Sequence, residues 1–228
     1  MSEDTRRAAL LAAEARALSL LDAIEDARFI RPGRLESEVE ADIKALARDV
    51  FGIRRHWHQR IVRTGANTIA TAGDDADDRV IGDPDIVFLD LGPVIGTWEA
   101  DVGRSCAVGD DPVRHALCRD LPLVFDAVTQ IAAASPDMTG EALYERACAE
   151  AAARGWVFGG KIAGHLVDEF PHARVPGDKR HGRIAPGNDV SLNAPDALGR
   201  PRHWILEIHL LEPGRRFGGF YERLLPTT

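Results

Sequence analysis

Residues 85–108, DIVFLDLGPVIGTWEADVGRSCAV, decide the fold. The run from Asp85 to Leu91 is rich in β-branched and large apolar residues, which predicts a buried strand. Residues 101–108 form a plausible partner strand. Gly96 lies between the two runs and can make a tight turn, so the stretch predicts an antiparallel hairpin.

Outward from this hairpin, the chain alternates between helical and strand-like patterns. The predicted helices span Thr5 to Arg28, Leu35 to Val50, Asp111 to Ala134 and Thr139 to Arg154. Further strands are predicted over His56 to Val62, His203 to Leu211 and Gly219 to Leu225, and a Gly/Pro/Asp-rich loop over Pro176 to Asp189. Two helices followed by strands, twice over, favour an α+β fold with helices packed on one face of a mostly antiparallel sheet.

Length, composition and net charge exclude several classes of protein. The 228 residues are 45% hydrophobic, which suits one large domain or two small ones with a sizeable core. A net charge of −8 argues against a nucleic-acid binder. No apolar run approaches ~20 residues, so no membrane span is expected. The three cysteines are widely spaced and odd in number, which favours a reducing cytoplasm; they are Cys106, Cys118 and Cys148.

Two pairs of acidic residues span predicted hairpins. The midpoint between Asp90 and Asp101 falls between Ile95 and Gly96. A hairpin centred there sets the two aspartates directly opposite one another.

The second pair is Glu207 and Glu222. Its midpoint falls between Gly214 and Arg215, just after Pro213. A hairpin centred at this turn also sets its two acids directly opposite one another.

These opposed acids require a compensating charge. Directly opposed residues in an antiparallel ladder have Cβ atoms ~4.5–5.5 Å apart, where like charges repel. Apolar neighbours add the cost of desolvation. Four carboxylates with one imidazole, for which His165 is the candidate, suit two divalent ions such as Mn, Co, Fe or Zn.

The order and spacing of these five residues resemble the pita-bread superfamily of metallopeptidases, which includes methionine aminopeptidase, Xaa-Pro aminopeptidase, prolidase and creatinase. The stretch 85–112 looks like the family's two-aspartate segment, with the basic Arg104 after the second aspartate. GHLVDEFPH resembles its metal-histidine segment, including a second histidine, His172. ILEIHL and GGFYERLL resemble its two glutamate strands. The resemblance covers residues 34–225 and implies the pita-bread fold, with its pseudo-twofold sheet. It also implies one catalytic domain over residues 1–228, without the separate N-terminal domain that Xaa-Pro peptidases and creatinases carry.

The resemblance also implies roles. Asp90, Asp101 and Glu222 would hold one metal ion, and Asp101 and Glu222 would bridge to a second ion completed by His165 and Glu207. A hydroxide between the ions would attack a carbonyl. Glu207 would take up and return a proton, and His172 would hydrogen-bond the substrate carbonyl or the tetrahedral intermediate.

The sequence departs from the family pattern around these residues. Leu166 and Val167 stand where the family has glycines after the metal histidine, and Ile208 stands where a proline usually follows the first glutamate. Glu212-Pro213-Gly214 looks like that glutamate–proline pair, but we interpret it as a turn because it lies only ten positions before Glu222.

The largest departure is a missing histidine. The peptidases carry one roughly twenty residues before the first aspartate, and this region, TGANTIATAGDDADD, contains none. His56 and His58 lie too far upstream to substitute without a different loop path. His209 is the better stand-in, because it is two residues beyond Glu207 and both side chains should face one side of the sheet.

We therefore expect a metal-dependent hydrolase of the aminopeptidase or creatinase type that cleaves a C–N bond in a small peptide or small amide-like substrate. Two alternatives stay open. One is a repurposed member with lyase-like or biosynthetic chemistry, and the other is a non-catalytic binding module, against which the complete ligand set argues. A homodimer is also left open.

Overall fold

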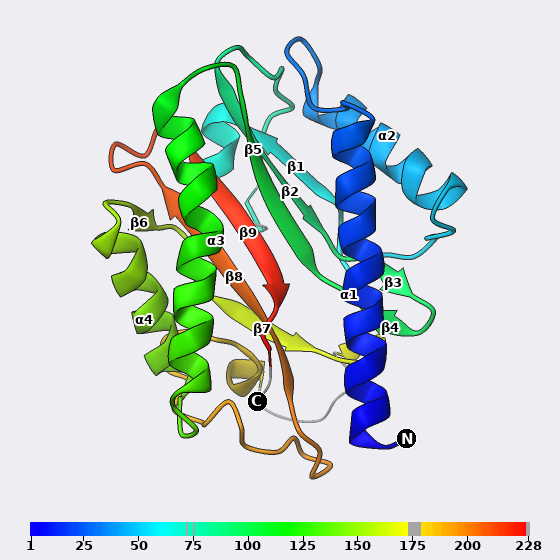
Figure 1. Ribbon diagram of the computed structural model, residues 1–228, viewed down its shortest axis with the longest axis vertical. Coiled ribbons are helices and arrows are strands. Elements are labelled where there is room, and N and C mark those ends of the chain that lie inside the picture. The colour runs from blue at the N-terminus through cyan, green and yellow to red at the C-terminus, as the bar shows by residue number, and fades with distance from the viewer. Residues whose placement is uncertain (72, 75, 173–178, 227–228) are drawn as a thin grey trace.

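The chain folds into a β-sheet with α-helices packed on it (Figure 1). The computed structural model describes residues 1–71, 73–74, 76–172 and 179–226. Within these residues, a seven-stranded antiparallel sheet has the order β1-β2-β5-β9-β8-β6, with β7 also paired to β8. A short β3–β4 ribbon extends the hairpin between β2 and β5.

The helices and long strands fall close to their predicted positions. The α-helices are α1 (Glu3–Asp26), α2 (Glu36–Asp49), α3 (Pro112–Ala133) and α4 (Gly140–Ala153). The strands are β1 (Ile61–Thr64), β2 (Asp85–Leu91), β3 (Val94–Ile95), β4 (Trp98–Glu99), β5 (Val102–Val108), β6 (Val157–Phe158), β7 (Gly164–Val167), β8 (His203–Leu211) and β9 (Gly218–Leu224). The predicted α+β class is confirmed.

Side-chain caps define where two of the helices begin. Asp111 accepts hydrogen bonds from the backbone N–H groups of Val113 and Arg114 at the start of α3. Thr139 accepts one from Ala142 at the start of α4, as predicted from the sequence. Each cap satisfies donors that have no partner in the first helical turn.

The predicted strand over residues 56–62 is confirmed only at its end, Ile61 and Val62. β1 begins only at Ile61, and residues 56–60 form a loop in which His56 makes an isolated bridge to Pro93. Of the predicted loop Pro176 to Asp189, residues 176–178 lie outside the described part of the chain, and a 3-10 helix covers Lys179–Gly182.

The helices α1 and α3 lie across one face of the sheet, separated from one another (Figure 1). Leu206, Ile208 and Leu210 of β8 pack into one core cluster with apolar residues of α3 and α4. Val87, Leu89 and Leu91 of β2 pack into a second cluster with α1 and α2. Because side chains alternate along a strand, the intervening Asp90, Glu207 and His209 face the opposite side. None of the helices in the described part of the chain combines the length and the hydrophobicity that a transmembrane segment requires.

Candidate metal centre

A row of paired residues crosses four strands on the face away from α1 and α3. Asp90 of β2 pairs with Gly103 of β5, Gly103 pairs with Glu222 of β9, and Glu222 pairs with Glu207 of β8. A Cβ atom on Gly103 would lie 2.6 Å from the Phe220 ring. The row therefore needs a glycine at this position, which lets the carboxylates on either side approach one another.

The two predicted hairpins have different outcomes. The direct opposition of Glu207 and Glu222 is confirmed. Asp90 does not lie opposite Asp101 as predicted; it lies opposite Gly103, two residues further along. The turn is centred one residue later than predicted, with Gly96 at φ +64°, and a one-residue shift of a turn moves the register by two. Asp101 is therefore a diagonal neighbour of Asp90, still within side-chain reach.

His165 of β7 points into this group of acids. Its Nε2 lies 3.1 Å from Oδ2 of Asp101, 3.6 Å from Oε1 of Glu207 and 3.8 Å from Oε1 of Glu222. Its Nδ1 lies 2.8 Å from the backbone carbonyl of Leu166. A carbonyl can only accept, so Nδ1 carries the proton and Nε2 is directed at the acids.

His58, which sequence reasoning set aside as too far upstream, also lies in the site. Its Nε2 is 3.1 Å from Oδ1 of Asp101 and 3.4 Å from Oδ1 of Asp90. The loop before β1 takes the different path that the sequence did not reveal. The backbone N–H of Trp57 donates to the carbonyl of Gly92, and its indole N–H donates to the carbonyl of Ala100.

The donor set fits divalent metal ions. Two groups have ligand atoms within 4.8 Å of one another, one formed by His58, Asp90 and Asp101 and the other by Asp101, His165 and Glu222. The Oε2 atom of Glu222 is buried and has no hydrogen-bond partner among the described residues. A buried carboxylate oxygen without a partner is costly unless a cation satisfies it.

Burial and mutual repulsion disfavour the charged form of three acids. Burial raises the pKa of Asp90 to about 7 and that of Glu207 to about 7. Burial, together with the neighbouring carboxylates, raises the pKa of Glu222 well above its ordinary value. In the protein alone, four carboxylates are held closer together than their charges favour.

In the two histidines and Asp101, by contrast, the pKa shifts favour the charged form. Burial opposes protonation of His58 and His165, but the hydrogen bonds and charges of the adjacent acids raise each imidazole pKa to about 9. Burial likewise opposes ionisation of Asp101, but its hydrogen bonds from both histidines lower its pKa. Two positive imidazoles thus partly neutralise the acids where a metal ion would otherwise do so.

His172 lies beside the acids and not among them. Its ring stacks on that of His165, with centroids 5.9 Å apart and planes at 17°. Glu99, which is 1% exposed, binds it twice: its Oε1 accepts from the His172 backbone N–H at 2.9 Å and its Oε2 lies 2.6 Å from Nδ1. Sequence reasoning missed Glu99, which fixes the orientation of this imidazole.

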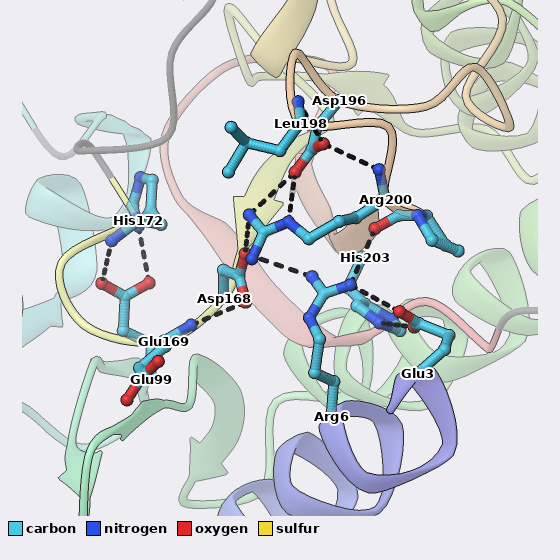
Figure 2. Close-up of polar contacts among 11 residues, drawn as sticks. Glu3, Arg6, Glu99, Asp168, Glu169, His172, Asp196, Leu198, Arg200 and His203 are labelled. Carbon is cyan, nitrogen blue, oxygen red and sulfur yellow. Dashed lines mark hydrogen bonds and ion pairs between the residues drawn. The ribbon is translucent and has the colours of Figure 1, made fainter. Parts of the chain in front are cut away.

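A network of charged side chains, buried at Arg6 and Asp168, anchors the segment between β7 and His172 (Figure 2). Asp168, at the centre, is bound by Arg6 of α1 at 3.1 Å and by Arg200 at 3.1 Å. Arg200 also binds Asp196, and Glu3 of α1 lies 2.7 Å from Nε2 of His203. The N-terminal turn of α1 thereby supports the loop that presents His172.

His209 shares the face of Glu207, as predicted, and lines a cavity of about 300 Å³ together with it. Burial lowers the pKa of His209, and its Nε2 lies 2.7 Å from the backbone carbonyl of Thr68. That nitrogen therefore donates to Thr68. A catalytic role for His209 stays a prediction.

A larger cavity, of about 700 Å³, opens over the acids. Its wall combines the predicted ligands with a charged rim. The lining includes Glu36, Glu40, Trp57, His58, Arg60, Arg63, Asp90, Asp101, Ile162, His165, Glu207 and Glu222. This volume accommodates a small molecule or a short peptide. The predicted turn at Glu212-Pro213-Gly214 lies outside this lining and connects β8 to β9.

Comparisons with known proteins agree with this architecture. The model of metallopeptidase family M24 matches residues 3–204. No curated protein matches significantly. A prolidase from Thermococcus sibiricus superposes with a TM-score of 0.71 at 18% identity, over 97% of this chain and 56% of its own. An Xaa-Pro dipeptidase from Bacillus anthracis gives 0.71 at 21% identity, over 97% and 57%.

A shorter solved structure matches over nearly its whole length. A methionine aminopeptidase from Rickettsia prowazekii gives a TM-score of 0.69 at 14% identity, over 98% of this chain and 94% of its own. By contrast, the chain spans just over half the length of the prolidase and the dipeptidase. These likenesses establish the pita-bread fold that the sequence predicted.

Proposed function

Because the chain belongs to metallopeptidase family M24, we propose that it is a dinuclear-metal-dependent hydrolase that cleaves a C–N bond in a small peptide or small amide. The observation that carries the proposal is the convergence of Asp90, Asp101, His165, Glu207 and Glu222 at the base of one cavity. Burial of several like charges in one place destabilises a fold, and a cation bound between these acids would compensate for that cost.

The proposed centre divides its donors between two ions. Asp90, Asp101 and Glu222 would hold one ion, and Asp101, Glu222, His165 and Glu207 the other. Bound divalent ions supply activation of a water molecule near neutral pH and polarisation of the scissile carbonyl. Carboxylate-rich sites accept several metals, and manganese and cobalt are our first choices for reconstitution.

The side chains around the centre would handle protons and orient the substrate. Glu207 would take a proton on its carboxylate and return it to the leaving nitrogen, a role that suits a group in contact with the reacting atoms. His172 has Nδ1 engaged by Glu99, so its Nε2 would meet the substrate carbonyl. A hydrogen bond that strengthens as charge develops there lowers the barrier.

The substrate is expected to differ from simple peptides. Residues 65–78 contain no histidine, and loss of one acid–base or positioning group costs ~10²–10⁴-fold in rate. We therefore expect poor turnover of methionyl and Xaa-Pro peptides and better turnover of a small polar amide. His209 would substitute if it acts beside Glu207.

A metal-reconstituted screen tests the proposal. The protein is loaded with Mn²⁺ or Co²⁺ and offered dipeptides, proline peptides and small amides, with His209→Ala assayed in parallel. Turnover of a small amide that His209→Ala reduces supports the proposal. Turnover of ordinary peptides at ~10 s⁻¹ would restore the plain aminopeptidase interpretation. Metal binding without any turnover would favour the repurposed or binding alternatives.

The proposed location is the cytoplasm. Cys106, Cys118 and Cys148 are all free, and burial raises the pKa of each thiol. Thiols that are neutral and unpaired suit a reducing compartment.

A further inference from the structure

His58 is held in place by close packing with the segment that follows β2. A Cβ atom on Gly92 would lie 2.2 Å from Cδ2 of His58 and 2.5 Å from the indole nitrogen of Trp57. Trp57 itself is hydrogen-bonded to Gly92 and to Ala100. Only a glycine at position 92 lets the imidazole reach the acids, so its position is built into the fold.

The ring of His58 is oriented as a metal ligand would be. Its Nδ1 lies 2.6 Å from the backbone carbonyl of Gln59 and must donate to it. Its Nε2 faces Oδ1 of both Asp90 and Asp101. The neutral ring presents a lone pair at this nitrogen, so a metal ion between the imidazole and the carboxylates can take the place of the proton that they share in the metal-free protein. Metal-bound histidines characteristically donate their other N–H to a carbonyl or a carboxylate.

The same arrangement occurs at His165. Each of the two histidines uses Nδ1 to donate to the carbonyl of the next residue in the chain, Gln59 in one case and Leu166 in the other. Each directs Nε2 at Asp101 from 3.1 Å, one at Oδ1 and the other at Oδ2. A carboxylate that presents its two oxygens to two imidazoles is arranged to bridge two ions, with one histidine on each.

We propose that Nε2 of His58 is a ligand of the ion held by Asp90 and Asp101. This inference rests on the proposed dinuclear function and extends it, because it gives that ion a nitrogen donor in addition to carboxylates. An imidazole favours borderline ions such as Co²⁺ or Zn²⁺ over Mg²⁺ or Ca²⁺.

A binding titration provides the first test. Metal-depleted protein is titrated with Co²⁺, and the bound metal is measured by elemental analysis after equilibrium dialysis. The wild type should bind two equivalents. In His58→Ala the affinity for one of them should fall by at least about 10–100-fold, the loss typical even of an outer-shell partner. His56→Ala is the matched control, because this histidine contacts Arg60 at 3.2 Å, and it should keep both affinities.

Proton NMR of the Co²⁺-loaded protein provides a direct test of coordination. The Nδ1–H of a histidine bound to Co²⁺ gives a strongly shifted signal that disappears in D₂O. The wild type should show two such signals, and His58→Ala and His165→Ala should each lose a different one. Retention of the other signal in each variant shows that the remaining site is intact. His58→Asn, which keeps a hydrogen-bonding side chain, should behave as His58→Ala does.

The outcomes separate the two proposals. Failure of the wild type to bind Co²⁺ would overturn the proposed function and this inference with it. Two equivalents of unchanged affinity in His58→Ala, with a single shifted signal in the wild type, would overturn this inference alone. His58 would then be an ion-pair partner of the two aspartates in a centre that is otherwise as proposed.

Discussion

Glu207 of β8 lies directly opposite Glu222 of β9, and the latter is only 2% exposed. Opposed like charges destabilise an antiparallel ladder. The pKa of Glu222 is raised well above its ordinary value and that of Glu207 to about 7. The protein alone is therefore strained at the position where a cation would stabilise it.

Substitution of Glu207 by Gln should stabilise the metal-free protein and weaken metal binding. At pH 8 the substitution removes a charge whose burial in the native state is unfavourable, and we expect a gain of about 1–3 kcal/mol in the free energy of unfolding. Thermal unfolding of metal-free protein measures this gain, and dialysis against Co²⁺ measures the affinity. Glu212→Gln is the control, because this turn residue is paired with Arg216 at the surface, and it should leave metal affinity unchanged. Loss of stability in metal-free Glu207→Gln would contradict the prediction.

The metal-free protein should become less stable as the pH rises from about 6.5 to 9, above the range in which the lowered pKa values of His56 and His209 have the opposite effect on stability. Asp90 and Glu207 have raised pKa values of about 7, so the native state holds their protons longer than the unfolded state does, and stability falls as the pH rises to 7. The raised pKa values of His58 and His165, about 9, extend this fall from about 6.5 to 9. The sign is the same for all four groups.

Metal should reverse this dependence. Because Mⁿ⁺ binds the neutral imidazole and the ionised carboxylate, protons compete with it below about pH 9, and apparent affinity should rise with pH up to that point. Melting temperatures across this range, with chelator and with saturating Mn²⁺, measure both effects. Parallel curves with and without metal would show that the ions do not bind these groups.

His172→Ala should reduce kcat while metal content stays near that of the wild type. The imidazole stacks on His165 but is oriented by Glu99, so it should act on substrate. Loss of one transition-state hydrogen bond costs roughly a hundredfold in kcat. Glu99→Gln keeps the shape of the partner but loses its charge, and it should cause a smaller loss. The assay requires the substrate found by the screen, and a normal kcat for His172→Ala would remove this residue from the mechanism.

Arg6→Ala should destabilise the fold far more than an ordinary surface arginine variant does. Arg6 is 5% exposed and pairs with Asp168, which is 7% exposed. Removal of one partner leaves a buried charge uncompensated, at a cost of about 3–5 kcal/mol. Arg48→Ala breaks an exposed pair with Asp49, and it should change the stability little because surface salt bridges are weak. Denaturant unfolding at fixed metal content compares the two, and equal effects would contradict the buried network.

The sequence allowed accurate prediction of those elements whose signals are local. β2 and β8 begin and end where their apolar runs do, and the turn after Pro213 is specific enough to set the register of Glu207 and Glu222. The register of β2 and β5 was predicted two residues out, because Gly96 can occupy either position of a two-residue turn and nothing local distinguishes them.

His58 and Glu99 could not be found in this way. Residues 56–62 have a composition typical of a strand, but hydrogen bonds from Trp57 to Gly92 and Ala100 convert the first five into a loop. These contacts join segments more than thirty positions apart, so the local hydrophobic pattern of the sequence does not reveal them. The only local signal for His58 was its place in a pair of histidines, His56 and His58, separated by one residue.

The charge network around Asp168 sets an order on folding. Arg6 and Asp168 are separated by 162 positions, and Glu3 and His203 by 200. Closure of such long loops is slow, because their entropy is lost before the contact is gained. During synthesis from the N-terminus, Glu3 and Arg6 cannot form these contacts until the chain has been made as far as Asp168 and His203. We therefore expect the loop that presents His172 to reach its fixed position late in folding.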